Sequence, residues 1–473
     1  MKRLKLAFVV LLVLGLTAPV FGAEVTIHGD LNNRFMVYTN QSSFFKGAGY
    51  SSNAESGTIT KDGTSDSWGE TKYRMWVEGA TNDGNVKGVY AIEMGSLRYG
   101  QPTAGDFSGD GINVETRWAY TDFQLPMVER KARIKLGLQP FKVNKYLWEE
   151  TIMGAVFDGS TGDTDYQFGW LRGHDVLRSD TASGDDMDAL MGRVDLKPAE
   201  GFKLGAYAVY NKSNANNTGA NGTVTAHRYQ LKFMASDTGN ADKVDFEIWD
   251  LGIDGSYNFG NFFINYDLIY QTGDIDNIDF IASDGVTYSN DQVDVSAYFA
   301  HLDVGLNIGD AKITYTFWYA SGDDNPGDGD FEGFRSTDVD SFDGVVLFEG
   351  YTDDNYFSER HYLLDKGFIM NKIALDYKVS EKLKVGAAVM YMMTAEDIEY
   401  TAAANGASVS ESDIGVEGDV YFSYMLYKNL EFAVNAGYLV AGDAMDFWEE
   451  DSIQNGSSDE DIIKVGTRVR YSF

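Results

Sequence analysis

Hydrophobic and polar residues alternate strictly at the end of the chain. From Ile463 to Phe473 every second residue is apolar, aromatic or threonine, whereas the residues between them include Lys464, Arg468 and Arg470. Because successive side chains of a strand point to opposite faces, one face of this segment is apolar and the other is basic. The pattern predicts a strand that lies between lipid and water.

The same period-two alternation recurs along the chain and predicts eighteen strands in all. In the first half they span residues 25–38, 70–80, 85–98, 112–124, 131–139, 152–160, 165–173, 187–196 and 202–211. In the second half they span residues 245–258, 261–271, 292–306, 311–320, 367–378, 382–394, 412–427, 430–441 and 461–473.

The links between these strands alternate in length. Short links follow the even-numbered strands, at residues 81–84, 125–130, 161–164, 197–201, 258–260, 307–310, 379–381 and 427–429. Long links follow the odd-numbered strands, and the longest spans residues 321–366. Outer-membrane barrels have an even number of strands, short periplasmic turns and long external loops. We therefore predict an all-β, transmembrane, antiparallel up-and-down barrel of about eighteen strands.

Two segments keep other strand counts open. Residues 225–235 also have the pattern of a strand, and only the parity of the links places them in an external loop. The sixth predicted strand, 152–160, alternates poorly. Sixteen strands are the alternative count, and a soluble β-sandwich or propeller is the alternative class. The sequence contains neither a blade-like repeat nor a linker that divides domains, which favours the barrel.

The N-terminus has the pattern of a secretory signal. Lys2, Arg3 and Lys5 precede an apolar run at residues 6–16, and small residues follow at 18–23. The apolar run is too short for a membrane-spanning helix. We expect residues 1–23 to be a cleaved signal peptide and residues 24–473 to form one barrel domain in the outer membrane of a Gram-negative bacterium.

Composition agrees with a barrel and excludes several functions. The chain has 51 Gly, 29 Tyr, 29 Phe and only 6 Pro, which suits strands, bends and aromatic girdles. It contains no Cys, which excludes disulfides and covalent haem attachment through Cys-x-x-Cys-His. The formal net charge of −34 makes nucleic acid a poor partner.

Much of the negative charge falls in the long loops, where acidic residues keep a surface solvated. One acidic run allows a sharper hypothesis. Carboxylate oxygens crowded around glycines suit Ca²⁺. A weak calcium site is therefore predicted in an external loop at Asp323, Asp324, Asp328 and Asp330, although the spacing departs from that of an EF-hand. We expect no other cofactor.

The predicted inner faces carry charges of both signs. The strands at the two ends of the chain, which meet when the barrel closes, supply the predicted basic wall of the pore: Arg34, Lys72, Arg74, Arg117, Arg133, Lys135, Arg468 and Arg470. Elsewhere the inner faces are more acidic, and the predicted acidic lining is Asp250, Asp254, Asp267, Asp303, Glu417 and Asp419. Opposed walls create a transverse field, and arginine forks bind carboxylates. The alternative is that these charges form local ion pairs, such as Arg74 with Glu78, that merely fill the interior.

The sequence offers little for catalysis. The five histidines form no metal-binding pair at short spacing, and the nucleophile-elbow, phosphate-loop and zinc-protease motifs are missing. Ser358, Glu359 and His361 lie too close together in sequence for a catalytic triad of ordinary geometry. We predict that the protein is not an enzyme.

Two segments resemble the alginate-export family of outer-membrane porins. Leu136-Gly137-Leu138-Gln139-Pro140, then Trp148 and Phe157-Asp158-Gly159, is similar to its Gly-Arg-Gln … Trp … Phe-Asp-Gly signature. The run from Tyr319 to Gly329 is similar to the Ala-Ser-Gly-Asp … Gly-Asp-Gly segment of that family. The resemblance implies an eighteen-stranded monomeric barrel with a charged lumen. Leu138 stands where the family has arginine, on the lipid-facing side of the predicted strand.

These patterns together predict a channel for passive diffusion of small hydrophilic solutes, with the basic wall guiding anions or carboxylates. Loop 321–366, if it folds inward, would add a constriction. A dedicated exporter of an alginate-like polysaccharide and the barrel sheath of an electron-transfer conduit are the alternatives. Expected partners are outer-membrane lipid and lipopolysaccharide, the barrel-assembly machinery and small solutes. A monomer is favoured, and a trimer is the alternative.

Overall fold

The computed structural model describes residues 23–41, 64–100, 112–174, 187–214, 245–281, 287–325, 328–337, 339, 344–347, 351, 366–449, 452–458 and 460–473. The predicted signal peptide lies outside these residues except for Ala23, and so does the ambiguous segment 225–235. No helix within the described ranges is long and apolar enough to cross a membrane.

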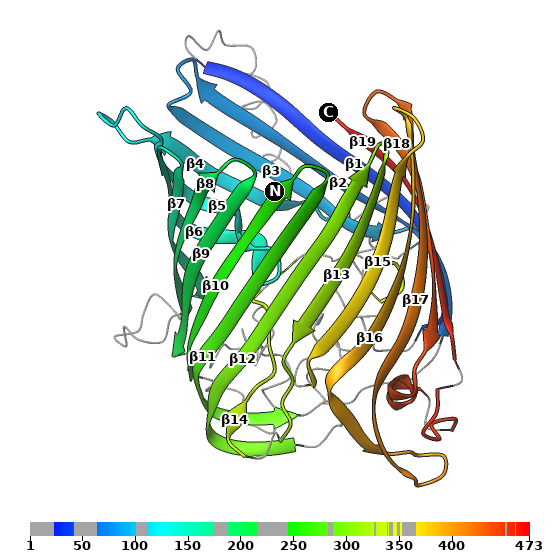
Figure 1. Ribbon diagram of the computed structural model, residues 1–473. Helices are drawn as coiled ribbons and strands as arrows, with labels where there is room; N and C mark the ends of the chain where they lie inside the picture. Colours follow the sequence, from blue (N-terminus) through cyan, green and yellow to red (C-terminus); the bar gives the residue numbers. More distant parts are fainter. Residues whose placement is uncertain are drawn as a thin grey trace.

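The described residues form a closed antiparallel β-barrel of eighteen strands (Figure 1). The first nine are β1 (Ala23–Gln41), β2 (Thr64–Thr81), β3 (Val86–Arg98), β4 (Glu115–Gln124), β5 (Ala132–Asn144), β6 (Trp148–Thr161), β7 (Thr164–His174), β8 (Met187–Ala199) and β9 (Phe202–Asn214). The others are β10 (Asp245–Phe259), β11 (Phe262–Ile281), β12 (Thr287–Ile308), β13 (Ala311–Ala320), β15 (Phe368–Lys378), β16 (Leu383–Thr401), β17 (Ser408–Tyr427), β18 (Leu430–Ala441) and β19 (Ile462–Ser472).

Each barrel strand pairs with its neighbours in sequence, and β1 pairs with β19 to close the sheet. Arg34 faces Arg468 across this seam, and Asn32 faces Arg470. Phe473 continues the pairing, since its backbone exchanges hydrogen bonds of 2.9 and 3.0 Å with Gly29. Closure leaves no unpaired edge, which any structure that crosses lipid requires.

The predicted number and order of strands are confirmed, and the sixteen-strand alternative is wrong. Most differences lie at strand ends, where β11 reaches Ile281 and β16 reaches Thr401. The poorly alternating sixth segment is a full strand, β6, and it begins earlier than predicted, at Trp148. One further two-residue strand, β14 (Asp330–Phe331), pairs in parallel with β12 from the loop after β13.

The two ends of the barrel differ. The short links, such as residues 260–261 between β10 and β11, lie at one end together with the C-terminus (Figure 1). The opposite end carries β14 and the short helix η3 (Asp443–Trp448). In outer-membrane barrels the short turns face the periplasm, so the second end is the external one.

Strand alternation separates an apolar outer face from an inner face with two zones. On β10 the large side chains of Trp249, Leu251 and Ile253 are exposed toward the membrane, whereas Ile248 and Asp250 point inward and are buried. Toward the external end the inner face is apolar and belongs to the main buried cluster, with members such as Val209, Ile269, Phe299, Met370 and Met392. Toward the periplasmic end it is polar. The core of this protein therefore lies inside the barrel, in its external half.

Candidate functional site

A segment of the loop after β13 folds into the barrel. Residues 332–347, here called the strap, are described at 332–337, 339 and 344–347. Phe334, Val346 and Leu347 are completely buried and pack in the interior cluster. Burying apolar side chains of this size contributes roughly 1.5–3 kcal/mol each. The inward fold anticipated for loop 321–366 thus occurs in its described part.

Three inner-face groups hold the strap. Glu417 of β17 accepts hydrogen bonds from three successive backbone N–H groups, those of Val345 at 2.9 Å, Val346 at 2.7 Å and Leu347 at 3.1 Å. The hydroxyl of Tyr38 on β1 donates to the carbonyl oxygen of Val346 at 2.9 Å. Gln271 of β11 bonds both the backbone N–H and the carbonyl of Arg335. The strap is therefore fastened to widely separated strands of the wall.

Close packing against the wall depends on Gly437 of β18. A Cβ atom at this position would lie 2.9 Å from side-chain atoms of Val345 and Val346 and 2.6 Å from Oδ1 of Asp419. Such distances are shorter than van der Waals contact, so a side chain there would displace the strap.

A second inward element joins β5 to β6. Residues 141–148, here called the inner hairpin, bury Phe141, Val143, Tyr146, Leu147 and Trp148. The Tyr146 ring lies 5.0 Å from that of Phe299 on β12 and 5.3 Å from that of Trp318 on β13, so the hairpin crosses the lumen. The carbonyl oxygen of Leu147 accepts a 2.8 Å hydrogen bond from the N–H of Thr337, which joins the hairpin to the strap.

The predicted basic residues near the seam are engaged with acids. Glu93 of β3 is shared by three of them: it contacts Arg74, lies 3.1 Å from Arg117 and 3.6 Å from Lys72. The other pairs are Arg34 with Glu70 at 2.5 Å, Arg133 with Asp122 at 2.7 Å, Lys135 with Asp158 at 3.0 Å, Arg468 with Glu431 at 2.7 Å, and Arg470 with Asp30. The structure thus brings the basic residues to one wall in local ion pairs, and Arg74 and Arg117 pair with Glu93 rather than with acids of their own strands.

The predicted acidic residues divide into two groups. Asp254 of β10, Asp267 of β11 and Asp303 of β12 form a network in which Asn144 of the inner hairpin donates to Asp254 at 3.0 Å and to Asp267 at 2.7 Å. The ring nitrogens of His301 lie 2.7 Å from Asp267 and 3.1 Å from Asp303. Arg193 completes this network through a two-point contact with Asp254.

The remaining acids contact or neighbour the strap. Asp250 accepts hydrogen bonds from Asn211 at 3.0 Å and from Gln271 at 2.5 Å, and it lies near the charge of Arg335. Burial lowers the pKa of Arg335 to about 10, whereas the Asp250 carboxylate acts in the opposite direction. The guanidinium therefore stays charged at neutral pH. Glu417 fastens the strap, and Asp419 lies beside it next to the cavity described below.

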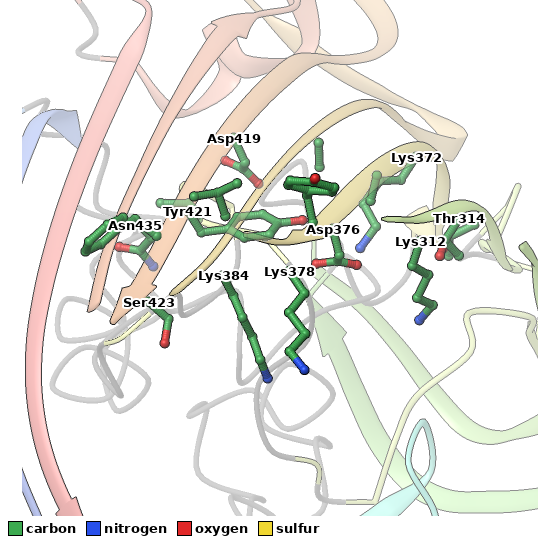
Figure 2. A pocket seen from close by; sticks show the side chains of 18 of the residues that line it. Lys312, Thr314, Lys372, Asp376, Lys378, Lys384, Asp419, Tyr421, Ser423 and Asn435 are labelled. Carbon is green, nitrogen blue, oxygen red and sulfur yellow. The ribbon is translucent and has the colours of Figure 1, made fainter. Parts of the chain in front are cut away.

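A cavity of about 770 Å³ lies under the strap, on the periplasmic side. Gly344, Val345 and Tyr351 of the loop after β13 line it, and strands β12, β13 and β15 to β19 supply the wall. Four lysines, Arg468 and several carboxylates line it. Figure 2 shows the lysines together with Asp376 and Asp419. The Arg468 guanidinium lies 4.3 Å from the centre of the Tyr351 ring and so joins the wall to the loop. A charged cavity of this size admits hydrated small solutes.

Sequence reasoning placed the inner hairpin in an external loop and did not foresee the lysines of this cavity as a group. An apolar run, Tyr146-Leu147-Trp148, inside a link expected to be solvated was the available signal for the hairpin. The lysines come from β13, β15 and β16, and their grouping depends on a register that periodicity alone does not give.

The four predicted calcium ligands lie within the described residues, although residues 326 and 327 between them do not. Asp323 accepts a hydrogen bond from the N–H of Asn325 at 3.1 Å, and Asp328 accepts one from the N–H of Asp330 at 3.0 Å. Within the described part of the chain no three His, Asp or Glu side chains gather as metal ligands. Calcium binding stays a prediction.

Solved structures from Pseudomonas aeruginosa share this fold. OpdO has a TM-score of 0.51 at 12% identity, with coverage of 95% of this chain and 97% of its own. OccK9 (OpdG) has a TM-score of 0.51 at 11% identity, with coverage of 95% and 98%. OccK8 (OprE) has a TM-score of 0.50 at 11% identity, with coverage of 95% and 98%. At this identity the likeness establishes a common barrel architecture, that of outer-membrane porins. No curated protein matches the sequence.

The resemblance drawn from the two short motifs is confirmed over a much longer range. Leu138 keeps its predicted orientation, since it shares a face with the exposed Leu136, and the inward-facing Gln139 beside it is buried. A sequence model described as alginate export matches residues 50–455. Because this match covers most of the chain, the protein belongs to the alginate-export family of outer-membrane β-barrels.

Proposed function

We propose that the protein is a passive channel that carries small hydrophilic solutes across the outer membrane. The observation that carries this proposal is the charged cavity of about 770 Å³ inside a closed barrel whose outer face is apolar. Such a channel needs neither catalysis nor a cofactor, because its selectivity follows from pore diameter and from the field of the lining charges.

The strap and the inner hairpin form the constriction. Both cross the lumen, and both are held by hydrogen bonds to the wall or to each other. A solute that enters from outside passes these elements before it reaches the charged cavity. Size selection therefore precedes charge selection.

The basic residues near the seam guide anions by exchanging their carboxylate partners for the passing anion. Its cations already touch carboxylates, so an incoming anion competes with Glu93, Glu431 or Asp30 for the same donors. Such competition weakens binding and speeds release, which suits permeation. The acidic network around Asp254 and Asp267 faces this wall and supplies the opposite sign.

Lipid and lipopolysaccharide are the partners of the apolar outer face, and we propose that the chain functions as a monomer. The C-terminal strand, with Phe473 paired to Gly29 at the seam, is the segment that the barrel-assembly machinery would engage. Because β1 and β19 already pair, the barrel is complete in a single chain.

Planar-bilayer recording of the purified protein tests the proposal. We expect discrete single-channel steps in potassium chloride and a reversal potential that shifts when Arg117 and Arg468 are replaced by Gln. The absence of ion-sized steps from folded protein would overturn the channel function.

Export of an anionic polysaccharide is a second candidate, favoured by the description of the family model. An exporter needs a continuous passage for a polymer, whereas the strap and the inner hairpin cross the lumen and contact each other. A haem protein inside the barrel would meet the same obstruction. Liposome swelling separates the candidates, since a diffusion channel admits monosaccharides and excludes long oligosaccharides.

A further inference from the structure

Three lysines on neighbouring strands line the periplasmic end of the cavity. Lys312 of β13, Lys378 of β15 and Lys384 of β16, here called the lysine group, all line it. Lys378 and Lys384 are direct partners in the register of β15 and β16. Figure 2 shows the two side chains extending in the same direction into the open space, with Lys312 nearby.

The charge balance of this group favours an anion. Like charges directly opposite on paired strands repel each other and destabilise the pair. Lys378 has a counter-charge in Glu381, 2.6 Å away, but Glu381 is a turn residue whose side chain is 90% exposed. Lys312 faces Asp376 in the register. No ion pair joins Lys384 to any side chain in the described part of the protein. Asp310 also lines the cavity and lies close enough to act on the charge of Lys378, so Lys384 is the member of the group whose charge no ion pair neutralises among the described residues.

The rest of the cavity offers groups for a polyhydroxylated body. The ring of Tyr421 covers Gly386, where a Cβ atom would lie 2.0 Å from Cε2 of the ring, so the glycine is what permits this flat position. Asn435 and Thr314 are more than nine-tenths buried and line the cavity. Their Oδ1 and Oγ1 atoms have no hydrogen-bond partner among the described residues. Both atoms are enclosed in the structure, and buried polar atoms are normally satisfied, so a rotation of either side chain toward the cavity would bring its unsatisfied oxygen to a hydroxyl group of a solute.

We infer that this cavity is a binding site for phosphate monoesters of sugars or polyols, with the phosphate held by the lysine group and the hydroxylated part lying between Tyr421, Thr314 and Asn435. The inference rests on the proposed channel function and names the solute class that the channel would retain on its periplasmic side. Sugar rings commonly lie against aromatic faces because their C–H surfaces are apolar.

The donor type separates phosphate from carboxylate. Arginine presents a planar fork that matches a carboxylate, whereas lysine ammonium groups act as point charges that surround a phosphate from several directions. The lysine group supplies ammonium donors from three strands. Arg468, the one arginine among the described residues that line the cavity, is already engaged by Glu431 at 2.7 Å and by the Tyr351 ring.

Calorimetric titration of the purified, folded protein with glucose 6-phosphate tests the inference, with glucose, glucuronate and inorganic phosphate as comparison probes. We expect glucose 6-phosphate to bind at least tenfold more tightly than each of the other three. Replacing Lys384 by Gln should weaken that binding about ten- to a hundredfold, because it removes a charge-assisted hydrogen bond.

Two further variants distinguish a loss of the binding site from a failure of the barrel to fold. Lys382→Gln is the matched control, since Lys382 lies in the adjacent turn and does not line the cavity. It should bind like the wild type. Glu381→Gln should bind more tightly, because it frees Lys378 from its carboxylate partner. A gain of affinity does not arise from a misfolded barrel.

Conductance recorded on the same preparation separates this inference from the channel proposal. One outcome is a protein that conducts ions and yet binds glucose 6-phosphate no more tightly than glucuronate or inorganic phosphate. That result would overturn the assigned solute class and leave the channel proposal intact. Selective binding without conductance would support the site and overturn the channel. An unchanged affinity in Lys384→Gln would refute the role of the lysine group.

Discussion

Because Glu417 holds the strap, we can predict how much more often the strap is released when Glu417 is replaced. In Glu417→Ala three buried backbone N–H groups, those of Val345, Val346 and Leu347, lose their acceptor. Each orphaned buried donor costs about 1–3 kcal/mol, so the total is about 3 kcal/mol or more. About 1.4 kcal/mol corresponds to a factor of ten in an equilibrium constant, so release of the strap should rise about a hundredfold or more.

Release of the strap does not require the barrel to unfold. The barrel is held by its closed ladder of strand pairs, whereas the segment 345–347 is held by Glu417, by Tyr38 and by the burial of three apolar side chains. We therefore expect a folded Glu417→Ala barrel whose single channels visit a larger conductance state far more often than wild-type channels do. Gel mobility before and after heating reports whether the barrel has folded.

Two variants calibrate the effect. Tyr38→Phe removes one hydrogen bond to Val346, a loss of about 1 kcal/mol, and should increase the larger state several-fold only. Glu70→Gln alters an equally buried glutamate that pairs with Arg34 and is not among the groups that hold the strap, so its effect on gating should be small. If folded Glu417→Ala showed wild-type conductance and noise, the strap would not be the constriction.

Three further outcomes follow from the same geometry. Glu93→Gln should raise the anion-to-cation permeability ratio, measured from reversal potentials, because Arg74 and Arg117 lose a shared neutralising charge. Asn144→Ala should increase open-channel noise, since the inner hairpin loses its two hydrogen bonds to carboxylates of β10 and β11. Burial and then neighbouring carboxylates raise the pKa of Glu332 above its usual 4.5, so the folded strap binds a proton more tightly than the unfolded chain does. This stabilisation is present below pH 4.5 and is lost as the pH rises through the raised pKa. Once exchange rates are corrected for the intrinsic effect of pH, the protection of the amides of residues 328–337 should fall over that range in the wild type and not in Glu332→Gln.

The barrel was predictable because one rule governs every strand. Alternation fixes which side chains face lipid, and the parity of short and long links fixes how many strands can close. The rule also oriented strands whose partners were unknown: Arg468 and Arg34 were assigned to a common wall, and they are direct partners across the seam. The ends of β11 and β16 escaped prediction because they extend toward the external loops, beyond the lipid zone where alternation is enforced.

The contents of the barrel were less predictable for a physical reason. Phe299, Met370 and Met392 lie on inner faces, yet they are apolar. In a water-filled pore such residues would be unfavourable, so apolar residues on both faces indicate that protein fills that part of the lumen. The sequence shows this two-sided apolar pattern. It does not show which loop provides the cover, because the match between the strap and Glu417 depends on positions more than seventy residues apart in the chain.

The arginines near the seam and the lysines of the lysine group differ in how closely carboxylates surround them, although both are cations of the lumen. Near the seam almost every arginine is a direct neighbour of a carboxylate, as at Glu93, so the field that reaches an anion in the pore is that of dipoles and decays quickly with distance. At Lys378 and Lys384 the register instead sets two ammonium groups opposite each other. Glu381 and Asp310 lie near Lys378, whereas no ion pair joins Lys384 within the described part of the chain. An anion should therefore pass the arginines near the seam quickly and stay longer at the lysine group. A passage that transfers solute inward benefits from this order, because the site of longest residence lies at the periplasmic end.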